Sequence, residues 1–438
     1  MNLLLINIPK HNMEPIFPFT LGTIAAIQKK KGWRVRGVDL FFDPADMVLS
    51  IMREERIDLV GIDVASDMNP YTADLCRNIQ SLQPVRVVAL GEYATLAGKD
   101  LFALIPGIEA TIRGDAEYAF SEVCQALTQN RDYNIKGVLN RQTTRTRAGE
   151  LALINNLDDL PFPDRDSFSV GQYANGMLTR QKIYAQIVTS RGCVHKCSYC
   201  AESVIGQPYR VRSPQNIVDE MAHLVDKYGI REFHVEDKNF IGHDIKRIKG
   251  LCALIGERPD TIEWQCAGVI PLSEMTDLNV IDAMASAGCY SISLGVESFH
   301  DTLTQRNRRR QSSQTVADVV QRCKDLGVEI CCSLIFGLPG QTLSEVKADI
   351  RQSRRFDFDF IHYNIFKPLM SQSSGKALPS DEEVLKHKRW QMWANVRLIF
   401  KFSVFRFILR RLVLRHNRGR FVKKIRYYLF GEKKVHVA

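Results

Sequence analysis

Three closely spaced cysteines constrain this chain more than any other feature. Cys193, Cys197 and Cys200 stand in a C-x3-C-x2-C pattern directly after an apolar run, Ile183 to Val188. Cysteine thiolates are the usual protein ligands of iron–sulfur clusters, and three of them leave one iron of a four-iron cluster without a protein ligand. An open coordination position marks a reactive metal site. Two other interpretations are a zinc knuckle, with His195 as the fourth ligand, and three unrelated thiols.

The same stretch resembles the signature of the radical S-adenosylmethionine superfamily, because an aromatic residue, Tyr199, precedes the last cysteine. The resemblance implies a 4Fe-4S cluster whose open iron is chelated by the amine and carboxylate of S-adenosylmethionine. One electron, supplied by a donor such as flavodoxin or ferredoxin, would then cleave the sulfonium. The resulting 5′-deoxyadenosyl radical would abstract hydrogen from a substrate.

Residues 1–130 alternate short apolar runs with helix-like segments. This alternation predicts an α/β domain with a doubly wound parallel sheet of Rossmann type. Asp43 and Pro44 look like the N-cap and the first residue of one helix. Ligands of such sheets sit beyond the carboxyl ends of the strands. The expected strands are Leu3–Ile8, Trp33–Leu40, Asp58–Val64, Val85–Leu90 and Ile108–Ile112, and the expected helices are Leu21–Lys31, Asp43–Arg56, Tyr71–Leu82 and Glu117–Leu127.

The order of these elements resembles the cobalamin-binding domain of many radical S-adenosylmethionine enzymes, so cobalamin is an expected cofactor. Two departures stand out. Glu92 occupies a position where the family commonly has a second glycine, and its side chain would crowd the nucleotide tail. The Asp-x-His-x-x-Gly motif that supplies a lower histidine ligand in methionine-synthase-like proteins is absent, and His11 is the only histidine in this region. The alternative is a sheet that only docks on the second domain. The matching pieces are Thr20–Ala26, Gly32–Asp39, Asp58–Ile62, Gly91–Thr95 and Arg113–Glu117.

Residues 131–180 are expected to form a linker, and residues 181–370 a barrel. The linker is polar and contains Pro161 and Pro163, which exclude a regular helix or a central strand. After it, six strand–helix units predict a partial (β/α)6 barrel. Active groups of parallel barrels lie at the carboxyl ends of the strands, where the cysteines fall. The expected barrel strands are Ile183–Thr189, Glu232–Glu236, Ile262–Ala267, Ser291–Leu294, Val328–Phe336 and Phe358–Phe366.

The resemblance also implies a set of cofactor-binding residues. Tyr199 is expected near the adenine, and the pair Glu236 and Asp237 near the methionine end of the cofactor. Glu297 matches a glutamate that commonly meets the ribose or the amino acid portion, because a carboxylate accepts hydrogen bonds from either. The turn of Phe336, Gly337 and Pro339 is expected near the adenosine. Helix caps or surface ion pairs are the alternative roles for the carboxylates. For Trp264 and Cys266 the two alternatives are the substrate side and the core, of which the core is the more common, and no residue is assigned a catalytic role.

Residues 371–438 are expected to form a basic, aromatic, helical tail. Residues 397–438 contain thirteen lysines and arginines and one acid, a net charge of +12, whereas the whole chain carries +10, so the remainder carries −2. A basic amphipathic helix on a membrane surface would have this composition. The alternatives are helices packed on the barrel, or a nucleic-acid contact that no recognised motif supports. The eleven cysteines form no disulfide pattern in a chain of 438 residues, which favours a reducing, cytoplasmic location.

Taken together, these patterns predict a radical S-adenosylmethionine enzyme. The leading hypothesis is a cobalamin-dependent methyltransferase that acts on an unactivated carbon or phosphorus of a small-molecule, lipid or pigment substrate. A radical cyclase or rearrangement enzyme is the second hypothesis, and a non-catalytic metal-binding adaptor is the third. A methylthiolating enzyme of transfer RNA would need further cluster cysteines, which Cys76 and Cys124 do not form.

Overall fold

The computed structural model describes the chain except residues 9–14, 65–68, 142–149, 174–178, 243, 268–276, 310, 367–380 and 400–438. The chain divides into two compact units, residues 1–173 and 174–436, so the first part of the expected linker belongs to the first unit. Over the described ranges, no helix combines the length and the apolar character needed to cross a membrane.

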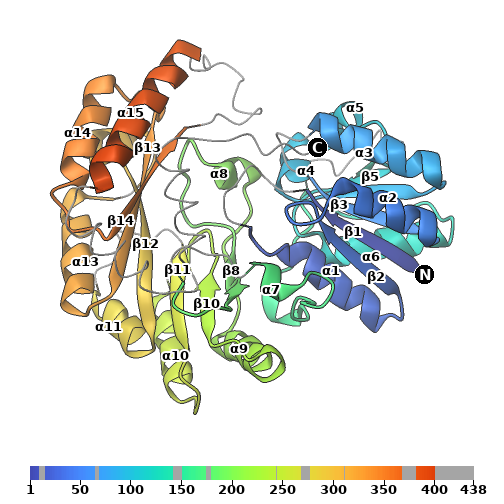
Figure 1. The fold of residues 1–438 in the computed structure, drawn as a ribbon, viewed down its shortest axis with the longest axis horizontal. Helices are drawn as coiled ribbons and strands as arrows, with labels where there is room; N and C mark the ends of the chain where they lie inside the picture. Colours follow the sequence, from blue (N-terminus) through green and yellow to red (C-terminus); the bar gives the residue numbers. More distant parts are fainter. Residues whose placement is uncertain are drawn as a thin grey trace. The chain divides into compact units, whose positions relative to one another are not determined.

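A six-stranded sheet forms the centre of the first unit (Figure 1). The strands run in the order β2-β1-β3-β4-β5-β6, and all neighbours are parallel except β5 and β6. The prediction of a doubly wound parallel sheet is therefore confirmed. The strands are β1 (Asn2–Asn7), β2 (Arg34–Asp39), β3 (Leu59–Asp63), β4 (Arg86–Leu90), β5 (Ala110–Ile112) and β6 (Val138–Asn140).

Helices cover both faces of this sheet because alternate strand residues point to opposite faces. Leu3 and Leu5 pack with the layer of α1 (Phe19–Lys30) and α6 (Ala116–Thr128). Leu4 and Ile6 pack with the opposite layer, to which four helices contribute. Those helices are α2 (Ala45–Glu54), α3 (Asn69–Leu82), α4 (Glu92–Ala97), which follows β4 directly, and α5 (Leu101–Leu104).

One local expectation for the first unit is wrong. Asp43 does not cap α2: Pro44 is the N-cap residue, and the Asp43 carboxylate accepts a hydrogen bond from the Asp39 backbone N–H (3.0 Å). The polar connector also contributes β6, whose antiparallel pairing with β5 extends the sheet. The connector carries further short helical segments at Leu157–Asp159 and in α7 (Val170–Tyr173).

The second unit is an open barrel of six parallel strands, in the order β7-β10-β11-β12-β13-β14. Because sequential strands are neighbours throughout, each helix returns the chain to the next position in the sheet, as in a (β/α)6 architecture. The predicted partial barrel is confirmed. The strands are β7 (Ala185–Ile187), β10 (Glu232–Val235), β11 (Glu263–Ala267), β12 (Cys289–Glu297), β13 (Glu329–Phe336) and β14 (Phe360–Ile365).

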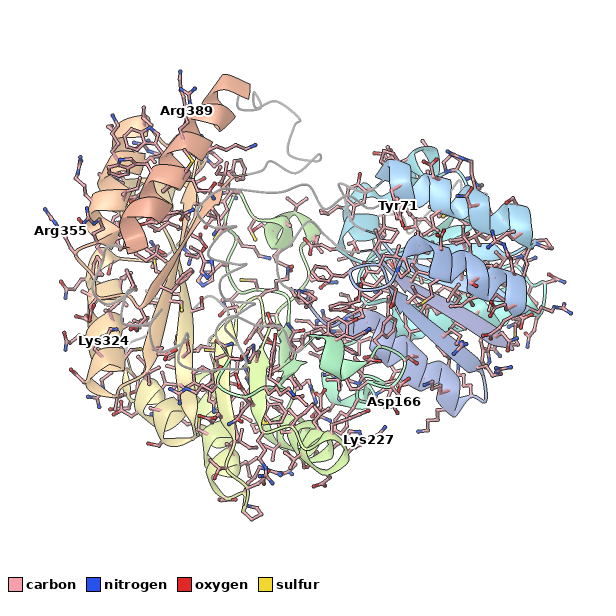
Figure 2. The ribbon with its side chains drawn as sticks, viewed as in Figure 1. Tyr71, Asp166, Lys227, Lys324, Arg355 and Arg389 are labelled. Carbon is pink, nitrogen blue, oxygen red and sulfur yellow. The ribbon has the colours of Figure 1, made fainter. Side chains whose placement is uncertain are left out.

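Helices flank this sheet on its outer side (Figure 1). Ser213 caps the helix Pro214–Tyr228 by accepting from the Asn216 N–H (3.2 Å), and Gly229 ends this helix at φ +68°. Charged side chains such as Lys227 and Lys324 lie on these outer helices (Figure 2). The helices are α8 (Ala201–Ile205), α9 (Pro214–Tyr228), α10 (Ile245–Gly256), α11 (Asn279–Ser286), α12 (Asp301–Arg306), α13 (Ser313–Asp325) and α14 (Leu343–Ser353).

Trp264 and Cys266 of β11 belong to the core of the barrel wall. Trp264 is buried, and its indole N–H donates to the Ala287 carbonyl (2.8 Å). Cys266 is buried near two thiols from the helix layer, Cys252 of α10 and Cys323 of α13, and burial raises the pKa of both neighbours to about 12. These thiols are protonated near neutral pH and pack as small apolar groups.

A last helix, α15 (Asp381–Ile399), packs on β14, the edge strand of the barrel. The side-chain amide of Gln391 donates to the backbone carbonyl of Tyr363 and so satisfies part of the open edge. The basic run that suggested a membrane contact lies almost entirely within residues 400–438, outside the described residues.

Candidate functional site

The three cysteines lie on a loop that a small antiparallel hairpin closes. Strands β8 (Ser190–Arg191) and β9 (Arg210–Val211) pair at the two ends of the loop. Gly192 adopts φ +76°, and a Cβ at this position would overlap the carbonyl oxygen of Pro208. Only glycine therefore fits where the loop leaves the barrel.

Cys193 and Cys197 both have hydrogen-bond donors directed at their sulfur atoms. Cys193 Sγ accepts from the His195 backbone N–H (3.4 Å) and from the Asn239 side-chain amide (3.9 Å). Cys197, the most enclosed of the three, is 5% exposed and accepts from the Arg309 guanidinium (3.9 Å). Donors of this kind stabilise the negative charge of cluster-bound sulfur. The donor set thus fits an iron–sulfur cluster.

Within the described ranges, no three or more His, Cys, Asp or Glu side chains are close enough to hold a single metal ion. A zinc ion at about 2.3 Å from each thiolate needs sulfurs roughly 3.8 Å apart. A four-iron cluster is larger and spreads its cysteine ligands further. The turn that joins the last two cysteines is closed by the Cys200 N–H, which donates to the Cys197 carbonyl (3.1 Å).

Asp237 and Glu236 follow β10 but have different surroundings. Asp237 is buried and accepts from the Thr189 N–H (2.6 Å) and from the hydroxyls of Thr189 (2.5 Å) and Ser190 (2.7 Å). Its carboxylate therefore holds the strand that leads into the cysteine loop. Glu236 is half-buried, and no described side chain or N–H donates to its carboxylate. Burial and the nearby charge of Asp237 raise the pKa of Glu236 to about 7.

Glu297 ends β12 in a conformation that strands do not normally adopt. Its φ is +64°, and the register between β12 and β13 shifts between Gly295 and Glu297. Such an irregularity redirects a side chain near a functional site. Glu297 is 8% exposed, and its Oε2 has no hydrogen-bond partner among the described atoms. Burial raises the pKa of Glu297, and the positive charge of Arg309 opposes this rise. The carboxylate has the acceptor capacity that a polar ligand would satisfy.

Tyr199 shares the surroundings of Glu297. Burial first, and then the charge of Glu297, raise the pKa of Tyr199 above its ordinary value, so the phenol stays protonated. Arg309 and Cys197 are its other ionisable neighbours. The structure therefore brings an aromatic ring, a carboxylate and the central thiol of the loop into one electrostatic environment.

The turn after β13 is held by one glutamine. Gln341 Oε1 accepts from the backbone N–H groups of Gly337 (2.7 Å) and Leu338 (3.2 Å). Gly337 has φ +83°, and a Cβ there would lie 3.0 Å from the His387 ring of α15. Phe336 is fully buried against Tyr363, and its carbonyl accepts from the Phe366 N–H (2.9 Å). Pro339 presents its carbonyl to the Asn307 side-chain amide (3.1 Å).

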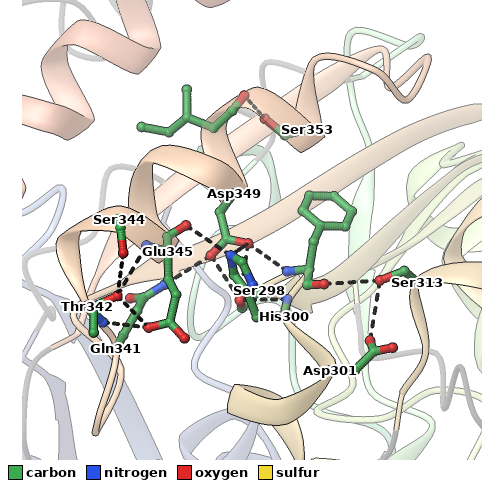
Figure 3. A network of polar contacts seen from close by, with 12 residues as sticks. Ser298, His300, Asp301, Ser313, Gln341, Thr342, Ser344, Glu345, Asp349 and Ser353 are labelled. Atoms are coloured by element: carbon green, nitrogen blue, oxygen red, sulfur yellow. Dashed lines mark hydrogen bonds and ion pairs between the residues drawn. The ribbon is translucent and has the colours of Figure 1, made fainter.

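A buried carboxylate, Asp349 of α14, joins this turn to the end of β12 (Figure 3). Its oxygens accept from the Ser298 hydroxyl (2.9 Å) and the Phe299 N–H (2.8 Å), next to Glu297. The same carboxylate accepts from the Gln341 amide (3.0 Å). The two turns that carry candidate cofactor-binding residues are thus fixed relative to each other.

Replacing Asp349 by alanine is expected to lower the free energy of unfolding by about 2–3 kcal/mol, because buried donors on two turns lose their acceptor. Chemical denaturation of the purified protein measures this difference. Asp318→Ala, on the exposed face of α13, is the matched control and should change stability by less than about 0.5 kcal/mol. Equal stability of both variants would contradict the bridging role of Asp349.

Sequence reasoning missed two residues that the structure places in this site, Asn307 and Arg309. Asn307 accepts from the Ser198 N–H (3.0 Å) and hydroxyl (2.8 Å), and its amide donates to Pro339, so it ties the cysteine loop to the β13 turn. Both residues belong to the run Asn-Arg-Arg-Arg after α12. A basic run in a loop is typical of a solvated surface, and only the burial of Asn307 and Arg309 distinguishes them from exposed Arg308.

In the first unit, the carboxyl edge of the sheet carries Asp39, Asp63, Gly91 and Gly114 at the ends of β2 to β5. Gly91 has φ +101°, and a Cβ there would overlap the Asp63 carboxylate. Glu92 begins α4 and is half-buried. Residues that follow β1 and β3 on this edge, His11 among them, lie outside the described ranges.

Family comparisons agree with both units. The model of the radical SAM superfamily matches residues 187–352, which hold the cysteine loop and the four barrel strands β10 to β13 in full. The model of the B12 binding domain matches residues 15–124. The chain belongs to the radical S-adenosylmethionine enzymes that carry a cobalamin-binding domain. Membership implies a 4Fe-4S cluster, S-adenosylmethionine and cobalamin as cofactors.

Two curated relatives carry methyltransferase names. An uncharacterized methyltransferase of Pyrococcus horikoshii is 28% identical over 73% of this chain and 69% of its own length. The cytidylyl-2-hydroxyethylphosphonate methyltransferase of Streptomyces wedmorensis is 24% identical over 81% of this chain and 76% of its own.

Two solved structures share the fold. The radical S-adenosylmethionine methyltransferase TsrM of Kitasatospora setae aligns with a TM-score of 0.68 at 21% identity, over 83% of this chain and 72% of that one. The cobalamin-dependent enzyme OxsB aligns with a TM-score of 0.67 at 15% identity, over 89% of this chain and 56% of that one.

Proposed function

We propose that this enzyme is a cobalamin-dependent radical S-adenosylmethionine methyltransferase that acts on an unactivated carbon or phosphorus of a small molecule. The observation that carries the proposal is the presence, in one chain, of the cysteine loop at the carboxyl end of the barrel and a B12-binding sheet. The methyltransferase names of relatives that align over most of both chains support it.

In this proposal the chain's own residues bind and orient the cofactors, which supply the radical and methyl-transfer chemistry. Cys193, Cys197 and Cys200 hold three irons of the cluster. Glu236 accepts from the amine of S-adenosylmethionine, and Glu297 accepts from its hydroxyl or amino groups.

The remaining candidate residues complete the cofactor site. Tyr199 lies against the adenine. The turn of Phe336, Gly337 and Pro339 lies beside the adenosine. Asp237 acts on the cofactor site indirectly, because its hydrogen bonds to Thr189 and Ser190 hold the base of the cysteine loop.

The test uses the full chain, reconstituted anaerobically with iron, sulfide and cobalamin. Uptake of cobalamin is read from the visible spectrum of the desalted protein. With a low-potential electron donor such as flavodoxin to reduce the cobalt, S-adenosylmethionine with a deuterated methyl group should place label on the bound cobalamin, detected by mass spectrometry. Protein that retains the cluster but takes up no cobalamin would exclude the methyltransferase version of the proposal.

A second candidate is a radical cyclase. The anaerobic magnesium-protoporphyrin IX monomethyl ester cyclase of Rubrivivax gelatinosus is 22% identical over 75% of this chain. This similarity favours a pigment-like substrate for the second candidate function. A cyclase forms 5′-deoxyadenosine without moving the deuterated methyl group, so the same label separates the two. Contact of the tail with a membrane would accompany a lipid or pigment substrate, and sedimentation with anionic vesicles tests it.

If Glu236 accepts from the methionine amine, the affinity for S-adenosylmethionine should depend on pH near 7. The carboxyl group, whose pKa is raised to about 7, is protonated below this pH and cannot then serve as a charged acceptor. As the pH rises toward 7, the affinity for S-adenosylmethionine is therefore expected to increase by up to about tenfold per pH unit. Above pH 7 it should level off. Calorimetric titrations of the reconstituted protein between pH 6 and 8 measure this slope. Glu236→Gln should flatten it, and an equal slope in both proteins would exclude the assignment.

A further inference from the structure

Arg309 is a buried cation at the centre of the candidate cluster site. Its side chain is 5% exposed and lies between the end of β12 and the cysteine loop. One terminal nitrogen donates to Cys197 Sγ (3.9 Å), and the other donates to the Gly295 carbonyl. The Nε–H donates to Gln311 Oε1 (2.8 Å). The three nitrogens of the guanidinium therefore each have a defined partner.

The position of this guanidinium is determined by the strand end rather than by a flexible chain. Gln311, its neutral partner, is itself buried, and its amide donates to the carbonyls of Val296 (2.6 Å) and Ser298 (2.7 Å). These contacts flank Glu297 on both sides. The planar donor fork is thus preorganised toward the thiol of Cys197.

The neighbours of Arg309 explain how the protein keeps a charge in this environment. Burial opposes the charged form and would lower the pKa of Arg309, whereas the nearby charge of Glu297 raises it. A buried cation destabilises the fold unless negative charge compensates it. Glu297 supplies one such charge, and a thiolate at Cys197 supplies another once it binds iron.

We propose that Arg309 is a positioning residue that holds the Cys197 thiolate by a charge-assisted hydrogen bond and raises the reduction potential of the cluster. This inference rests on the proposed function. When the cluster accepts one electron from an external one-electron donor, the negative charge of the site grows by one, and a fixed cation beside a ligand sulfur stabilises the reduced state.

The sequence itself provides a matched control. Arg308 is adjacent to Arg309 but exposed, so Arg308→Gln removes the same charge from solvent, where water screens it. Arg309→Gln removes the buried charge and two of its donors. Arg309→Lys keeps the charge but cannot reproduce the fork to Cys197 and Gly295 together.

The experiment is a potentiometric titration of the reconstituted full chain, followed by electron paramagnetic resonance of the reduced cluster, with iron content measured for every variant. Arg309→Gln is expected to disfavour reduction about tenfold, which for one electron lowers the potential by about 59 mV. Arg309→Lys should lower it less, and Arg308→Gln should leave it unchanged.

Equal potentials in wild type and Arg309→Gln, at equal iron content, would overturn the proposal. If Arg309→Gln fails to fold or to retain iron, Arg309→Lys decides, and a wild-type potential in that variant overturns the proposal. Weaker binding of S-adenosylmethionine at an unchanged potential would assign Arg309 to the cofactor and also overturn it. A wild-type protein without a reducible cluster would instead exclude the proposed function, so the two failures are distinguishable.

Discussion

Replacement of Cys197 by alanine is expected to abolish formation of 5′-deoxyadenosine from S-adenosylmethionine. Cys197 is the most enclosed thiol of the loop and the partner of Arg309. Its loss would leave two cysteine ligands for the cluster and a buried cation without its sulfur acceptor. Loss of an outer-shell partner of a metal ligand typically costs 10–100-fold, so loss of a ligand itself should exceed about 100-fold. Iron content after anaerobic reconstitution should fall in parallel.

Cys252→Ala is the control for this prediction, because it removes a buried thiol from α10 in the same unit. It should retain wild-type iron content and 5′-deoxyadenosine formation. Circular dichroism should show that both variants fold. Wild-type product formation by Cys197→Ala would show that the loop cysteines do not hold the catalytic cluster.

Glu297→Gln is expected to weaken S-adenosylmethionine binding by about 10- to 100-fold. The substitution preserves shape and the positive φ but replaces a charged acceptor, and hydrogen bonds to charged groups contribute about 1.5–3 kcal/mol. Oε2 of Glu297 is buried and has no described partner, so a ligand is the natural source of its hydrogen bond. A side chain held at positive φ costs free energy and often marks a functional position. Calorimetry of reconstituted protein measures the dissociation constant.

Glu263→Gln is the control for Glu297→Gln, because Glu263 lies at the amino end of β11 and accepts a hydrogen bond from Arg180 Nη1 (3.1 Å). Its substitution should leave the dissociation constant within about twofold of the wild type. If Glu297→Gln binds S-adenosylmethionine as tightly as Glu263→Gln, Glu297 is not a cofactor ligand.

Much of the barrel could be predicted from the sequence, because apolar residues recur in its strands and several of its helices are followed closely by a glycine, as at Gly229, Gly288 and Gly327. The end of β12 could not. Gly295 interrupts the apolar pattern, and the predicted strand stopped at Leu294, whereas the observed strand continues through an irregular register to Glu297. A pattern of residue types does not predict the backbone irregularity that orients the Glu297 carboxylate.

The polar contacts of the site also could not be predicted from the sequence. Asp237 and Glu236 are adjacent acids, but successive residues at a strand end point in different directions. In the structure the Asp237 carboxylate accepts hydrogen bonds from Thr189 and Ser190, which the sequence does not predict. The sequence pattern predicts Asp43 as a helix cap, but its carboxylate accepts a hydrogen bond from the Asp39 N–H instead. In each case a long-range partner, invisible to local spacing, determines what the side chain does.

The central claim is that the three loop cysteines hold a four-iron cluster with one iron open to S-adenosylmethionine. Mössbauer spectroscopy of the full chain, reconstituted with iron-57, tests it most directly. The account predicts that addition of S-adenosylmethionine changes the signal of about one quarter of the cluster iron and leaves the rest unchanged. An identical spectrum before and after addition, or no cluster signal in fully reconstituted protein, would contradict it.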